Sequence, residues 1–160
     1  MLGYRVTRPT VMLKVLKNLF DNAQVDAKPA SGFERRQLYF AVAVLLHEAR
    51  RADYVEGEVE SAPAERALAE LFGLERAQAA ALLEEARTKA QQVNSFYAPL
   101  SVVKRDFSLE DRIRLVEHLW RVTYADGQLN YYEDHYVRKI AHLLYVPNTQ
   151  SMLARNRARS

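Results

Sequence analysis

Oxygen ligands gather in one short stretch of this 160-residue chain. Asp126, Asn130, Glu133 and Asp134 supply three carboxylates and one amide. Hard cations bind oxygen atoms, and calcium takes about six to eight of them. Asp53, in a second acidic stretch, is a fifth candidate ligand. These residue types predict a divalent metal site, although their spacing differs from that of an EF-hand loop.

The same stretch also has a purely structural interpretation. Gly127 suits the left-handed conformation that ends a helix. Asn130 suits the cap of the next helix, Glu133 completes a capping box, and Leu129 stands where a hydrophobic staple would be. Two interpretations therefore remain open: a corner between helices, and a corner that also binds a cation.

Tyrosines follow directly after this corner. Tyr131, Tyr132 and Tyr136 lie within its second helix, and Tyr132 and Tyr136 are four residues apart. Tyrosine is enriched in protein interfaces because its ring is large and its hydroxyl is polar. We therefore predict an interaction surface here. The alternative is the edge of a core whose hydroxyls reach solvent.

Catalytic patterns are missing from the sequence. The four histidines form no metal-binding or catalytic spacing, and no nucleophile elbow, P-loop or dinucleotide fingerprint occurs. There is no cysteine, which excludes disulfides and thiolate metal sites. We expect no enzyme activity and no cofactor other than a divalent metal ion.

Charge is unevenly distributed along the chain. The net charge is +3, yet all 20 acidic residues lie within 21–134, so the two ends are basic and the body is acidic. An acidic body repels phosphate, and we expect no nucleic-acid partner. No apolar run reaches the roughly 20 residues of a membrane span. We expect a cytoplasmic protein, with two options left open: peripheral membrane contact through 12–20, and a homodimer.

Helical periodicity runs through the chain, and no segment alternates with period two. This predicts an all-α fold of seven or eight helices. Trp120 is expected to be buried against the second and seventh of them. The predicted helices cover 12–20, 33–52, 63–72, 75–97, 100–106, a segment that starts after Ser108, 131–145 and 149–158.

A weak internal repeat accompanies these helices. Residues 46–53 parallel residues 119–126, and Leu-Phe-Gly-Leu at 71–74 is echoed by Leu-Leu-Tyr-Val at 143–146. Two helical hairpins related by a pseudo-twofold axis would produce this pattern.

One family shares this combination of motifs. The Ala-Asp-Gly-x-Leu-Asn-x-x-Glu corner, the Trp-Arg-Val helix before it and the Val-Pro exit after it resemble the TerB-like family, the tellurite resistance protein B group. The resemblance covers roughly residues 12–158, which we assign to one domain, with 1–11 as an N-terminal extension. At the first corner Tyr54 replaces the glycine of the motif, and Gly57 comes three residues late.

The resemblance implies a helical bundle in the bacterial cytosol, a role in metal binding and tellurite stress, and no catalysis. The function we expect is that of a metal-responsive interaction module in a stress response, with a protein partner. The alternative is a metal-free protein-binding or scaffold domain, with a peripheral position at the inner membrane left open.

Overall fold

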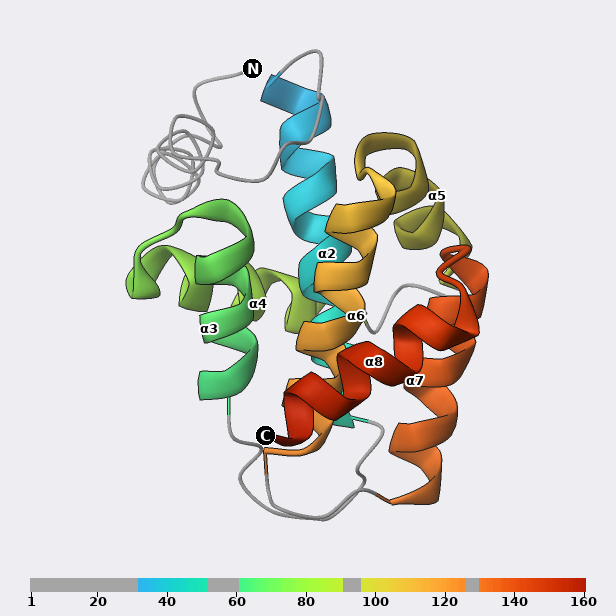
Figure 1. Ribbon diagram of the computed structural model, residues 1–160. Helices are drawn as coiled ribbons and strands as arrows, with labels where there is room; N and C mark the ends of the chain where they lie inside the picture. Colours follow the sequence, from blue (N-terminus) through green and yellow to red (C-terminus); the bar gives the residue numbers. More distant parts are fainter. Residues whose placement is uncertain (1–31, 52–60, 91–95, 126–129) are drawn as a thin grey trace, which may run out of the picture.

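The computed structural model describes residues 32–51, 61–90, 96–125 and 130–160. Within these ranges the chain forms seven helices and no strand, which confirms the all-α prediction (Figure 1). The expected helix at 12–20 and extension at 1–11 lie outside the described residues. The helices are α2 (Gly32–Arg51), α3 (Ala62–Phe72), α4 (Arg76–Ala90), α5 (Tyr97–Asp106), α6 (Leu109–Thr123), α7 (Tyr131–Leu143) and α8 (Asn148–Arg159).

Helix α2 lies at the centre of the bundle. Helices α3, α4, α5, α6 and α7 all pack against it. Its middle turns are therefore buried on nearly every side, including Tyr39, Ala43 and Val44. A helix that is apolar all round is typical of such a position.

Helix α6 is enclosed between α2 and α8, and α8 crosses its outer side (Figure 1). Trp120 on α6 is fully buried, as predicted. Its ring is covered from α8, where the guanidinium carbon of Arg155 lies 5.6 Å from the ring centroid. The Arg155 Nε also donates to the hydroxyl of Tyr124, at 2.9 Å. Helix α8 thus covers Trp120, a contact that the sequence did not predict.

Helices α3 and α7 end in the same way. Gly73 has a φ of 68°, and the next amide, that of Leu74, donates to the Ala69 carbonyl at 3.1 Å. Tyr145 has a φ of 58°, and the amide of Val146 donates to the carbonyl of Ala141 at 2.9 Å. Both are the six-to-one bond of a Schellman ending. The shared ending supports the internal repeat inferred from the sequence.

The boundary between α4 and α5 differs from the prediction. Helix α4 ends at Ala90, and Tyr97 begins α5. The predicted helix 75–97 was therefore too long, and the predicted 100–106 too short. Pro99 lies in the first turn of α5, where a missing amide proton breaks no helical hydrogen bond.

Candidate functional site

The α6–α7 corner contains the predicted capping box. Asn130 has extended backbone angles, and its side-chain oxygen accepts from the Glu133 amide at 2.8 Å. In return, Glu133 Oε1 accepts from the Asn130 amide at 3.1 Å. Glu133 is only 2% exposed, so this carboxylate is part of the packed corner. The two bonds satisfy amides that the first turn of α7 leaves without a helical partner.

The cap uses oxygen atoms that were predicted to bind a metal. Asn130 and Glu133 bond to each other's amides, and Asp134 bonds to Arg138 Nε at 2.6 Å. In the part of the chain that the structure describes, no group of three His, Asp or Glu side chains is placed to hold an ion. Asp126 and Asp53 lie outside the described residues. The three described candidates therefore fit a structural corner, and the metal site stays a prediction.

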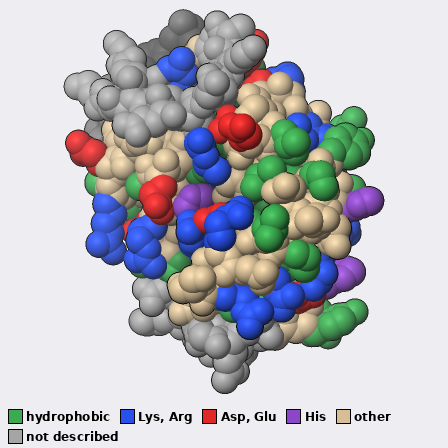
Figure 2. Space-filling model, in the orientation of Figure 1, with side chains coloured by type: hydrophobic (Ala, Val, Ile, Leu, Met, Phe, Trp, Pro, Cys, Tyr) green, Lys and Arg blue, Asp and Glu red, His purple; other side chains and the backbone are tan. Residues whose placement is uncertain are grey.

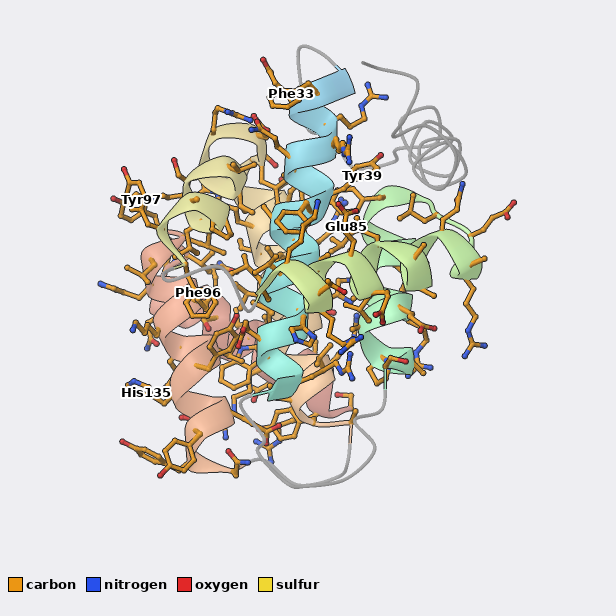
Figure 3. All side chains as sticks on the ribbon, turned by 180° about the vertical axis from the view of Figure 1, so that it is seen from behind. Phe33, Tyr39, Glu85, Phe96, Tyr97 and His135 are labelled. Carbon is orange, nitrogen blue, oxygen red and sulfur yellow. The ribbon has the colours of Figure 1, made fainter. Side chains whose placement is uncertain are left out.

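Two of the three predicted interface tyrosines are exposed. Tyr131 and Tyr132, at the start of α7, are 75% and 70% exposed. Their rings meet edge to face with centroids 5.6 Å apart, and the Tyr131 ring stacks on His135 at 6.1 Å. His135 points away from the bundle on the outer side of α7 (Figure 3). We call Tyr131, Tyr132 and His135 the aromatic cluster.

Tyr136 does not belong to this exposed surface. Its hydroxyl donates to the Leu45 carbonyl of α2 at 2.8 Å, and its ring meets Phe96 edge to face at 6.0 Å. Burial raises the pKa of the Tyr136 hydroxyl well above its ordinary value, and the nearby charge of Glu48 raises it further. Tyr136 therefore ties α7 to α2. Tyr132 and Tyr136 are four residues apart and so share one face of α7. That face is wide enough for Tyr136 to turn inward while Tyr132 stays exposed.

The comparisons with known proteins bear on this architecture. The sequence profile of tellurite resistance protein TerB matches residues 39–156, about three quarters of the chain. The chain belongs to the TerB family. The match runs from α2 to α8 and includes the α6–α7 corner. It confirms the resemblance inferred from the sequence. No curated protein sequence and no solved structure matched the chain.

Among the described helices of this TerB domain, none is long and apolar enough to cross a membrane. The expected membrane contact through 12–20 falls outside the described residues.

The TerB domain also contains a polar cavity that the sequence did not reveal. It has a volume of about 260 Å³ and lies between one side of α3 and the last turns of α6. Arg66 and Glu70 line it from α3, and His118 and Arg121 line it from α6. Ala62, Pro63 and Ala125 complete the lining.

His118 is the most deeply buried polar group of this cavity, with 7% of its surface exposed. Burial lowers the pKa of its imidazole. The charges of Glu70 and Glu117 oppose this shift, and the charges of Arg121 and Arg114 lower the pKa further. The spacing of the histidines in the sequence had indicated no metal-binding or catalytic role for it. Helical spacing puts His118 and Arg121 on one side of α6, but only the packing of α3 against α6 brings Arg66 to the same place.

Proposed function

We propose that this TerB-family protein is an interaction module of a tellurite or stress response, and that it binds another protein through the aromatic cluster on α7. The observation that carries the proposal is the exposure of Tyr131 and Tyr132 side by side. Two large rings at 75% and 70% exposure hold a considerable apolar area in water. A partner that covers them gains by removing that area from solvent.

The capping box makes this surface rigid. Tyr131 and Tyr132 occupy the first turn of α7, the turn that the bonds between Asn130 and Glu133 hold in place. Rings presented from an ordered turn lose less conformational entropy on binding than rings on an irregular segment. Asp134 and its partner Arg138 stand on the same helix and supply polar groups for the rim.

Cross-linking in cells tests the interface. A photoreactive phenylalanine analogue at position 131 should cross-link to a discrete partner, and the same analogue at position 97 should not. Tyr97 is a matched control because it is also 75% exposed but lies on α5 (Figure 3). The Tyr131→Ser/Tyr132→Ser double variant should lose complementation of a tellurite-sensitive deletion strain at normal protein levels, and Tyr97→Ser should retain it. Equal cross-linking at both positions with full complementation would refute the interface.

A divalent ion at the α6–α7 corner is the second candidate, as a regulator of the same surface. Its support is position: Glu133 and Asp134 put two carboxylates in the first turn of α7, directly beside Tyr131 and Tyr132, and Asp126 precedes them in the sequence. An ion bound there would compete with the bonds of the capping box. It would thereby change the turn that presents the rings. No catalytic step is part of either proposal.

Calorimetric titration with calcium, manganese and zinc separates these candidates. An ion at 100 times its dissociation constant stabilises the folded state by about 2.7 kcal/mol. If the ion binds at the corner, Asp126→Asn should abolish both the heat and this stabilisation. No heat with any of the three ions, together with a functional aromatic cluster, would leave the metal-free module as the function.

A further inference from the structure

The cavity between α3 and α6 has the composition of a binding site for a small anion. Its volume of about 260 Å³ is smaller than the ~300–1,000 Å³ of pockets for drug-sized ligands, so it suits a small molecule. Figure 2 shows both basic and acidic side chains around a histidine on this face of the molecule.

His118 is a buried polar group whose ring nitrogens bond to none of the residues that the structure describes. Neither ring nitrogen is fully desolvated without a partner, so a hydrogen-bond partner for the imidazole can come from solvent or from a bound ligand. His118 lines the cavity, so a ligand inside it is placed to supply that partner.

The charges around the cavity favour an anion. Arg66 forms no ion pair with any described residue. Arg121 pairs with Glu117, but Glu117 is shared with Arg157, so two guanidiniums surround a single carboxylate. Among the described residues of the lining, Glu70 is the one acidic side chain, and a single carboxylate is too few oxygen ligands for a hard cation.

The start of α3 adds to this preference. Ala62 and Pro63, its first two residues, line the cavity, and Ser61 makes no side-chain cap. The first turn therefore presents the positive end of an 11-residue helix, and the acidic residue in that turn, Glu65, is paired with Arg76 at 3.4 Å. The negative end of α6 lies on the same side, but Arg121 in its last turn offsets it.

We propose that this cavity binds a small molecule through a carboxylate or phosphate group, held by Arg66 and Arg121 at the rim and by His118 at the base. Glu70, a lining residue whose charge acts on His118, would accept a hydrogen bond from a hydroxyl or an amine of the same ligand. The site is separate from the aromatic cluster on α7, and the two proposals stand or fall independently.

Titration of the histidine rings by NMR tests the proposal in the intact protein. The probes are inorganic phosphate and acetate, each compared with chloride at equal ionic strength. A bound anion stabilises the imidazolium, so the pKa of His118 should rise. A rise of about 1 in this pKa means that the anion binds the charged imidazole about ten times more tightly than the neutral one. The exposed histidines of α7, His135 and His142, serve as internal controls and should not respond.

Two variants locate the effect. Arg66→Gln should remove most of the rise at His118. Arg138→Gln should leave it unchanged, because Arg138 lies on α7 and pairs with Asp134. A response to phosphate alone identifies a phosphate ligand, and a response to both probes identifies a site that accepts carboxylates too. If neither probe moves His118 more than His135 and His142, the cavity is not an anion site.

Discussion

The capping box at the start of α7 gives the sharpest quantitative prediction. Asn130→Ala removes the acceptor of the 2.8 Å bond from the Glu133 amide, and loss of such a cap costs about 1 kcal/mol. Glu133→Ala removes the reciprocal 3.1 Å bond to a carboxylate, which is worth about 1.5–3 kcal/mol. Glu133→Gln keeps an acceptor and loses only the negative charge at the helix N-terminus, about 0.3–1 kcal/mol.

The expected order of destabilisation is therefore Glu133→Ala, then Asn130→Ala, then Glu133→Gln. Ser108→Ala on α6 is a matched control, because Ser108 caps its helix through a single, longer bond of 3.2 Å to the Asp111 amide. It should cost no more than Asn130→Ala. Urea unfolding with unchanged m-values measures these differences in the free energy of unfolding.

Two results would refute the reasoning. If Asn130→Ala is as stable as the wild type, the box does not hold the first turn of α7. If millimolar calcium stabilises the wild type and leaves Asn130→Ala unaffected, the main role of the Asn130 side-chain oxygen is to bind the ion, and capping the helix is secondary. The double variant of Asn130 and Glu133 should cost less than the sum of the single variants, since both bonds order the same turn.

Four further predictions concern the rest of the fold. Trp120→Ala should destabilise by about 3–5 kcal/mol, and the wild-type fluorescence maximum should be that of a buried indole. Tyr136→Phe should cost about 1 kcal/mol in urea unfolding through loss of the 2.8 Å bond to α2. Gly73→Ala, at φ 68°, should cost about 1 kcal/mol, whereas Tyr145→Gly, at φ 58°, should be neutral or stabilising by thermal unfolding. Burial lowers the pKa of His118 below its ordinary 6.5 in the folded state. As the pH falls, this histidine is therefore protonated at a higher pH in the unfolded chain than in the folded protein. The free energy of unfolding should thus fall as pH drops below about 6.5, and His118→Gln should flatten that part of the profile.

Local signals in the sequence were enough to predict several helix ends, although not the boundary between α4 and α5. The capping box of Asn130 and Glu133, the cap of Ser108 and the stop at Gly73 depend on residues within one or two turns of each other. Such short-range chemistry is readable without knowledge of the fold. Tyr145 is the exception, because tyrosine does not mark a left-handed position.

Contacts between distant segments could not be predicted in this way. The bond from Tyr136 to Leu45 joins residues 91 positions apart, and it decides that this tyrosine faces inward. The approach of Arg66 to His118 likewise depends on how α3 packs against α6. Periodicity assigns a side chain to a face of its helix, but the neighbours of that face come from the tertiary arrangement.

The enclosure of α2 sets the order in which the domain opens. Its middle amides are surrounded by five helices, so they should exchange with deuterium only in global unfolding. Helix α8 buries little besides Ser151 and Ala154 and is tied to α6 by Arg155 and by the ion pair of Arg157 with Glu117. Its amides should exchange earlier, in a sub-global opening that uncovers Trp120 while the centre of the bundle stays closed.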